Sequence, residues 1–327
     1  MNHGEFHRSA ELVAAIHRGA GGVFPSYRAA HAYGRFYAGT FTADPAAKDV
    51  SRASHFQGTP VPVTARFSGV GGNPEDKPST IVAMSTKFYL ADGTVTDMIS
   101  ITLPAFLTRT PDEFIEFIDA RFADPQGHEP DPEIFAAFLA GHPNTARVVH
   151  KLLGQPALVS FARMNYRPLH TFRFVNASGE ARWARYHWEP EAGVAGQSKE
   201  ALAAHPKDHL FDEFEERLWQ GPVGFRLELE LAQDGDSVDD PSLIWPDDRE
   251  RVVVGRMELN RAITENEIGD SVMMHDPTAV TDGIEISPGD EVIAARRGAY
   301  LLSAAERTGG WQQRADGTAA RTLAQGG

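Results

Sequence analysis

A tyrosine near the end of the chain is accompanied by two arginines at helical spacing. Tyr300 lies four residues after Arg296 and seven before Arg307, so on a helix the three side chains project within roughly 40° of one another. Guanidinium charge beside a phenol favours the phenolate, which is the form that binds a metal. We therefore interpret Tyr300 as a candidate axial ligand for haem iron, with Arg296 as its counter-charge. The alternative is a surface helix whose arginines are solvated.

A histidine early in the chain is suited to acid–base chemistry on the other side of such an iron. His31 lies among small residues, in the run FPSYRAAHAYGRFYAGTF, that would let a flat ring approach. Histidine can take a proton from one peroxide oxygen and return it to the other, because its pKa lies near working pH. Arg28, three residues earlier, could direct a cation at a carboxylate of the cofactor. The alternative is a hydrogen-bonded structural histidine.

Composition limits the class of protein. The chain has 327 residues, of which 42% are hydrophobic and 23% are charged, which is ordinary for a globular protein with a large core. The net charge of −14 argues against a nucleic acid or an anionic membrane as partner. The lack of cysteine excludes disulfides, thiolate-bound haem and iron–sulfur clusters. We find no signal-peptide pattern and no apolar run of about 18 residues, so we expect a cytoplasmic protein.

Sequence patterns predict an antiparallel β protein with added helices. Alternating hydrophobic residues and turn signals predict strands and hairpins at 60–68, 81–90, 94–103, 170–176, 181–188, 222–232 and 250–257. Helices are expected at 5–19, 111–123, 207–219 and 288–306, the last with Ser287 as its N-cap. The strands do not alternate regularly with helices. The fold class is therefore predicted as α+β, with a large antiparallel β-barrel surrounded by helices.

The same patterns suggest three parts in the chain. Residues 1–24 form an N-terminal helical segment, and residues 25–307 contain the barrel and its last helix. The Gly-, Ala- and Gln-rich tail, 308–327, is expected to be frayed.

The motifs around His31 and Tyr300 resemble those of the catalase superfamily. The run from Arg28 to His31, followed by Gly34, is similar to the distal catalase motif. The run VTARFS, residues 63–68, is similar to a catalase strand whose arginine holds a haem propionate and whose serine bonds the distal histidine. Arg296 and Tyr300 match the proximal Arg-x-x-x-Tyr motif, and the matches are collinear from about residue 25 to 307.

This resemblance implies a set of roles around haem b, which would lie between the barrel and the proximal helix. Tyr300 would bind the iron, and Arg28, Arg66 and Arg307 would hold the propionates. His31 would be the acid–base group and Ser68 would orient it. Phe106 and Phe114 would supply apolar walls against the porphyrin.

Two features depart from a full-length catalase. The long N-terminal arm and C-terminal helical region are missing, which resembles the short catalase-related peroxidases, or mini-catalases, and favours a homodimer over an interwoven tetramer. The second feature is chemical. If Pro104 and Phe106 are aligned with catalases, Thr102 occupies the place of the distal Asn, and Ala30 replaces a bulkier Val. Thr offers one hydroxyl on a short stem, so the step that orients a second peroxide should suffer most.

We therefore expect a haem b-dependent peroxidase. It would reduce hydrogen peroxide or organic hydroperoxides with a small organic donor and have weak catalase activity. Two alternatives remain open at this point. One is a rearrangement of fatty-acid hydroperoxides, as in the catalase-like allene oxide synthases, and the other is a non-enzymatic haem sensor or store.

Overall fold

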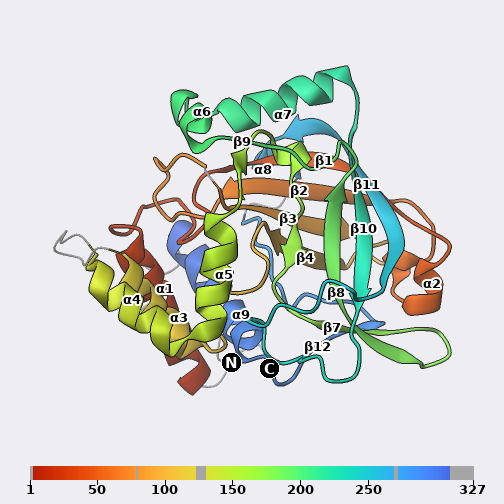
Figure 1. Cartoon of the computed structure of the whole chain (residues 1–327). Coiled ribbons are helices and arrows are strands. Elements are labelled where there is room, and N and C mark those ends of the chain that lie inside the picture. Colours follow the sequence, from red (N-terminus) through yellow and green to blue (C-terminus); the bar gives the residue numbers. More distant parts are fainter. Residues whose placement is uncertain (1–2, 79, 123–129, 269–271, 310–327) are drawn as a thin grey trace.

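The computed structural model describes residues 3–78, 80–122, 130–268 and 272–309. Within these residues, a ten-stranded antiparallel sheet has the order β12-β7-β8-β10-β11-β1-β2-β3-β4-β6 (Figure 1). The strands are β1 Gly34–Ala43, β2 Val61–Gly69, β3 Val82–Tyr89, β4 Val95–Ile101, β6 Arg167–Pro168, β7 Phe172–Val175, β8 Ala181–Pro190, β10 Val223–Leu231, β11 Arg251–Ile263 and β12 Ile284–Ile286. A separate pair joins β5, Ala157–Leu158, to β9, Gly196–Gln197.

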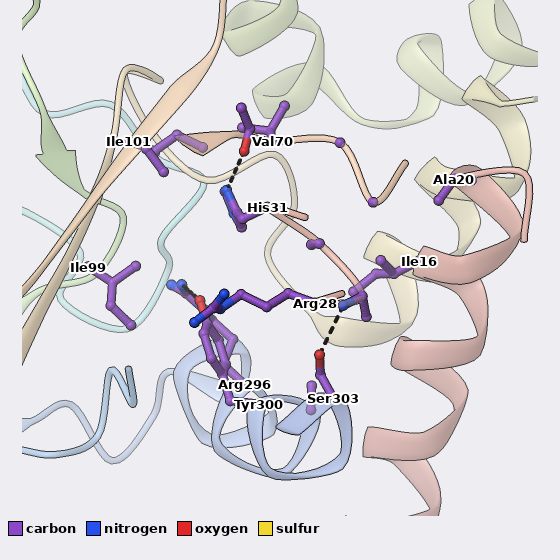
Figure 2. Close-up of a pocket in the computed structure, with 18 of the residues that line it drawn as sticks. Ile16, Ala20, Arg28, His31, Val70, Ile99, Ile101, Arg296, Tyr300 and Ser303 are labelled. Atoms are coloured by element: carbon purple, nitrogen blue, oxygen red, sulfur yellow. Dashed lines mark hydrogen bonds between the residues drawn. The ribbon is translucent and has the colours of Figure 1, made fainter. Parts of the chain in front are cut away.

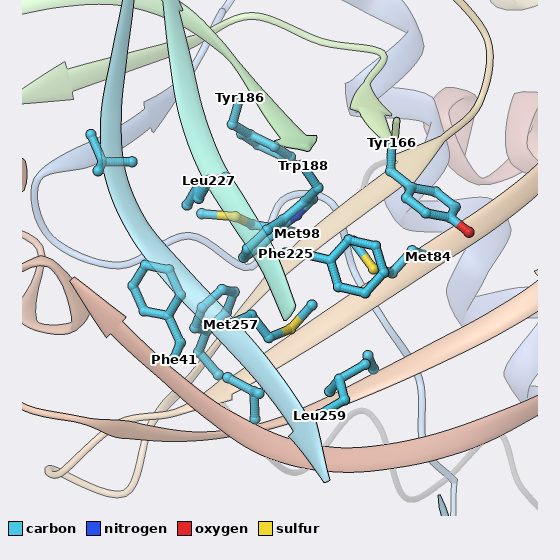
Figure 3. Packing of buried hydrophobic residues seen from close by; sticks show 14 of the residues in the cluster. Phe41, Met84, Met98, Tyr166, Tyr186, Trp188, Phe225, Leu227, Met257 and Leu259 are labelled. Carbon is cyan, nitrogen blue, oxygen red and sulfur yellow. The ribbon is translucent and has the colours of Figure 1, made fainter. Parts of the chain in front are cut away.

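The sheet curls until the β6 end returns to β8. Tyr166, directly before β6, exchanges backbone hydrogen bonds of 3.0 and 2.8 Å with Trp188 of β8. The concave side encloses the main apolar core, in which Phe41, Trp188 and Phe225 lie close together (Figure 3). The predicted α+β class is confirmed, and the predicted barrel is a large curled antiparallel sheet with surrounding helices.

Nine α-helices lie in the described residues. They are α1 His3–Gly19, α2 Ala47–Val50, α3 Pro111–Arg121, α4 Pro132–Gly141, α5 Pro143–Leu153, α6 Lys199–Ala204, α7 His209–Gln220, α8 Glu265–Ile268 and α9 Glu291–Arg307, with 3₁₀ turns at Ser54–Phe56 and Phe161–Arg163. Helix α1 packs against both α3 and α9, to the side of the curled sheet (Figure 1). None of these helices is long and apolar enough to cross a membrane.

Local chemistry explains where the helices near the cavity begin. Thr110 caps α3 by accepting a hydrogen bond of 3.2 Å from the Glu113 amide, and Pro111 follows at the first helical position. In α9 the cap is Asp290, which accepts 3.0 Å hydrogen bonds from the amides of Val292 and Ile293. The prediction of Ser287 as the cap is therefore wrong. The Ser287 hydroxyl instead donates to Asp239.

Other predictions on the elements have mixed outcomes. Strand β1 was not predicted, although it lies in the centre of the sheet between β11 and β2. Residues 310–327, which include almost all of the tail that was expected to be frayed, lie outside the described residues.

Candidate functional site

A cavity of about 590 Å³ lies between the convex face of the sheet and helices α1, α3 and α9. The strand register places Arg66, Ser85 and Ile99 side by side on β2, β3 and β4, and all three line the cavity. The neighbouring residues Phe67 and Met84 belong to the core on the opposite face, as expected because successive side chains of a strand alternate. The sheet therefore separates an apolar core from the candidate site.

The α9 side of the cavity carries Tyr300 and a chain of hydrogen bonds behind it. Arg296 donates from one guanidinium nitrogen to the Tyr300 hydroxyl at 2.7 Å, and its other terminal nitrogen lies 2.8 Å from Nε2 of His170. Nδ1 of His170 lies 2.6 Å from Asp290 Oδ2. The chain of contacts thus runs from Tyr300 to the residue that caps the same helix.

The protonation of His170 fits this chain. Burial lowers the pKa of His170, and the Asp290 carboxylate only partly opposes that effect. A neutral ring with its proton on Nδ1 donates to Asp290 and leaves Nε2 to accept from Arg296. The sequence patterns did not indicate this role for His170. The available signal was an acidic residue at the start of the tyrosine helix.

His31 lies on the other side of the cavity from Tyr300 and Arg296 (Figure 2). Its backbone is in the left-handed region, at φ 57°, which is uncommon for a residue with a side chain. The end of β2 holds it there, because the His31 amide donates to the Val70 carbonyl at 3.2 Å. Nδ1 lies 3.0 Å from the Gly69 carbonyl and 3.3 Å from the Ser68 hydroxyl. A proton on Nδ1 would be donated to Gly69, which leaves Nε2 as the basic nitrogen.

The environment keeps His31 neutral. Burial and then the positive charge of Arg66 lower the pKa of His31 to about 4, whereas the hydrogen bond to Gly69 acts in the opposite direction. Arg296 and Arg28 lower the pKa further. A neutral imidazole can accept a proton at ordinary pH, so the geometry leaves His31 able to act as a base.

Three arginines from separate elements line the cavity: Arg28 from the segment before β1, Arg66 from β2 and Arg307 from the end of α9. Arg28 donates to the Met273 carbonyl at 2.9 Å, and Arg307 donates to the Val272 carbonyl. Gly34 is required beside Arg66, because a Cβ there would lie 2.7 Å from the Arg66 guanidinium carbon and 2.5 Å from a backbone oxygen. The cluster of three arginines can neutralise the charge of bound carboxylates.

Aromatic rings form part of the cavity wall. Phe106 and Phe114 both line it, with ring centroids 5.4 Å apart. Phe106 also stacks on His170 at 6.2 Å.

Thr102 does not line the cavity, which corrects the expectation that its hydroxyl faces a bound peroxide. The hydroxyl accepts from the Val82 amide at 3.1 Å and lies 3.4 Å from the Thr80 carbonyl, to which it donates. Ile99 and Ile101 face the cavity instead (Figure 2). The cause is the alternation of side chains along the strand, which turns the residue after Ile101 to the other face.

The structure brings the other predicted residues together. Those that line the cavity are Arg28, His31, Arg66, Phe106, Phe114, Arg296, Tyr300 and Arg307. Ser68 lies behind His31, within 3.3 Å of its Nδ1. The arrangement offers a tyrosine oxygen and a neutral imidazole on opposite sides of an apolar cavity with a cationic end.

Comparisons with known proteins point in one direction. The family model described as "Catalase" matches residues 25–316. A catalase-related peroxidase of Mycolicibacterium paratuberculosis is 36% identical over 91% of this chain and 94% of its own length. A catalase-related peroxidase of Synechococcus elongatus is 33% identical over 92% of this chain and 88% of its length. The solved structure of a bacterial catalase superposes with a TM-score of 0.75 at 22% identity, over 86% of this chain and 57% of that one.

Proposed function

This chain belongs to the catalase family and is an oxidoreductase, and from that premise we propose that it is a haem b-dependent peroxidase. Its substrates would be hydrogen peroxide or organic hydroperoxides, and a small organic molecule would supply the electrons. The observation that carries the proposal is the placement of His31 and Tyr300 on opposite sides of one cavity, whose cationic end is formed by Arg28, Arg66 and Arg307. Relatives that cover almost the whole chain are named catalase-related peroxidases, which supports it.

The residues of the cavity fit haem b. The flat, apolar ring of the cofactor would lie against Phe106 and Phe114, and its two carboxylates suit the cluster of Arg28, Arg66 and Arg307. Tyr300 would hold the iron, and the hydrogen bond from Arg296 would stabilise the phenolate form. Bound haem would supply the redox chemistry, while the chain supplies orientation and charge.

His31 would handle the proton of the peroxide. Its neutral ring can accept a proton from one oxygen and return it to the other. Ser68 and the Gly69 carbonyl contact Nδ1 and fix the ring orientation, so they act through His31.

The wall around His31 supports peroxidase over catalase chemistry. Val70 and Ile101 lie beside His31, Ile99 lines the cavity from the same strand as Ile101, and all three side chains are apolar (Figure 2). Catalase turnover needs a second peroxide to be oriented in the same pocket, for which a positioned hydrogen-bond donor would be needed. An apolar wall accepts organic hydroperoxides and donors more readily.

The first test is a spectrum of haem-replete protein, followed during addition of peroxide. We expect a high-spin ferric tyrosinate spectrum. When a phenolic dye is present as the electron donor, we expect its oxidation to be faster than the release of oxygen. Cumene hydroperoxide should also support dye oxidation. Tyr300→Phe should lose the tyrosinate spectrum, and His31→Gln should keep the spectrum but react at least about 100-fold more slowly.

Several results would overturn the proposal. They are the lack of a haem band, a spectrum unchanged in Tyr300→Phe, and oxygen release faster than dye oxidation. Conversion of a fatty-acid hydroperoxide with no donor consumed would indicate a rearrangement.

A further inference from the structure

A second histidine lines the cavity, and none of the roles above uses it. His275 is only 5% exposed and precedes Asp276 in the segment that leads to β12. Its Nε2 is buried and has no hydrogen-bond partner within the described part of the chain. Buried polar atoms in native proteins are almost always hydrogen-bonded. Nε2 of His275 therefore calls for a partner that the described residues do not provide.

The ring of Phe36 connects His275 with the arginine cluster. His275 stacks on Phe36 with centroids 6.5 Å apart and planes inclined by 13°. The guanidinium carbons of Arg28 and Arg66 each lie 5.6 Å from the centroid of the same Phe36 ring. His275 thus belongs to the cationic end of the cavity.

The charges around His275 indicate what kind of partner is missing. Burial lowers the pKa of His275 well below its usual value, and the positive charges of Lys87, Arg28, Arg66 and Arg307 lower it further. A neutral imidazole in a positive field suits an anionic partner, which can accept a hydrogen bond from Nε2–H. The buried carboxylate of Asp97 is not the missing partner, because Lys87 already binds it at 2.8 Å.

The backbone on both sides of His275 is fixed before any ligand binds. On one side Arg28 donates to the Met273 carbonyl at 2.9 Å. On the other side the Asp276 amide donates to Asp97 Oδ2 at 2.8 Å. The imidazole is therefore presented to the cavity by a braced segment, as a ligand-binding group should be.

We propose that His275 donates a hydrogen bond from Nε2 to a propionate carboxylate of the bound haem, as a fourth group beside Arg28, Arg66 and Arg307. This inference rests on the proposed haem function and deepens it. His275 is a binding residue that recognises the carboxylate and thereby fixes the orientation of the cofactor.

The test compares haem with its dimethyl ester, in which both carboxylates are blocked. Apoprotein is titrated with each, and binding is followed by the Soret band and by quenching of tryptophan fluorescence. His275→Phe keeps an aromatic ring against Phe36 but loses the donor. We expect it to bind haem about tenfold more weakly, as for a charge-assisted hydrogen bond, and to bind the ester as the parent does. His275→Gln, whose amide can donate, should recover part of the loss.

His55→Phe is the matched control, because His55 is also buried with unpartnered ring nitrogens but lies in the barrel core. It should bind both ligands as the parent does. The ratio of the two affinities within each variant is independent of the fraction folded. The inference would be overturned if His275→Phe bound haem as tightly as the parent, or if it lost affinity for haem and for the ester to the same extent. Either result would leave the proposed function intact. Failure of the parent protein to bind haem would instead overturn the proposed function.

Discussion

The chemistry of the cavity wall next to His31 depends on which face of β4 each residue occupies. Ile99 and Ile101 face the cavity, whereas Met98 lies in the barrel core. Thr102 follows Ile101 and uses its hydroxyl on the backbone of the neighbouring strand. A shift of one residue in the alignment therefore exchanges a hydrogen-bond donor for an apolar contact.

Exchanging Ile101 for Asn should place an amide donor in the cavity beside His31. We expect the ratio of oxygen release to dye oxidation to rise by at least about tenfold, since one positioned donor can contribute about 100-fold or more to a rate. An oxygen electrode and a dye assay on haem-replete protein measure the two rates.

Thr102→Val is the matched control for this experiment. It removes the hydroxyl at nearly constant volume and should leave the ratio unchanged, while costing about 1 kcal/mol of stability. A changed ratio in Thr102→Val together with an unchanged ratio in Ile101→Asn would mean that the assignment of faces is wrong.

Single residues differ in how well the sequence predicts them. His31 and Tyr300 lie in short motifs with fixed internal spacing, so the sequence alone singles them out as candidates. The assignment of Thr102 fails because side chains on a strand alternate with every residue, and the alignment rested on Pro104 and Phe106 beyond the strand end. The contact of His170 with Asp290 joins residues 120 positions apart, and no local pattern records it.

Helix α9 links fold and site through its first residue. Asp290 uses Oδ1 to accept from two helix amides and Oδ2 to contact His170. His170 in turn contacts Arg296, which bonds Tyr300 one turn further along the same helix. The start of α9 and the orientation of its tyrosine are thus coupled.

Two substitutions at Asp290 should separate these effects. Asp290→Ala removes both, and we expect a loss of roughly 2–3 kcal/mol in the free energy of unfolding of the apoprotein, from the cap and the orphaned His170 proton. Asp290→Asn keeps the capping oxygen but turns an amide N–H₂ toward His170. It should cost about 1 kcal/mol yet shift the tyrosinate absorption of haem-loaded protein. Urea unfolding and absorption spectra measure the two effects, and equal losses in both variants would contradict this division.

Among the elements, β1 shows why the sequence patterns missed a strand. Its run GRFYAGTFTA lacks regular alternation, and its exposure pattern is equally irregular. The pairing with β11 shifts register between Ala38 and Gly39, where a Cβ on Gly39 would lie 1.9 Å from the Glu258 carbonyl oxygen. A bulge that admits only glycine is set by the partner strand, and strand patterns within one segment do not contain that information.

At the scale of the whole molecule, histidines are buried on both sides of the sheet. His31 and His275 line the cavity, His170 lies behind Arg296, and His55 lies in the barrel core beside Phe56 and Phe88. Burial lowers the pKa of His55 to about 3, and the pKa values of the other three are also lowered. The fold therefore holds several imidazoles in the neutral form.

These histidines should make the stability of the apoprotein sensitive to acid. Between the unfolded-state pKa of about 6.5 and the folded-state pKa, which is about 4 for His31 and about 3 for His55, the unfolded chain binds protons that the folded chain excludes. Each histidine with a lowered pKa therefore makes the free energy of unfolding rise with pH. The contribution is fully present above about pH 6.5 and is lost as the pH falls toward the folded pKa values. Asp97, whose pKa burial raises to about 6, acts with the opposite sign over part of this range. Comparing the pH dependence of a histidine variant with that of the parent therefore isolates one contribution, which the pH profile of the parent alone does not.

His55→Phe removes one such histidine without touching the cavity. We expect its free energy of unfolding to fall less than that of the parent between pH 7 and pH 5, by roughly 1 kcal/mol or more, because a group that is protonated only in the unfolded state has been deleted. Urea unfolding at each pH measures the difference. Replacement of the exposed His150 by Gln is the control and should leave the parent's pH slope unchanged. A His55→Phe slope equal to that of the parent would show that His55 is not held neutral by the fold, and a changed slope in the His150 variant would show that surface charge, not burial, sets the acid sensitivity.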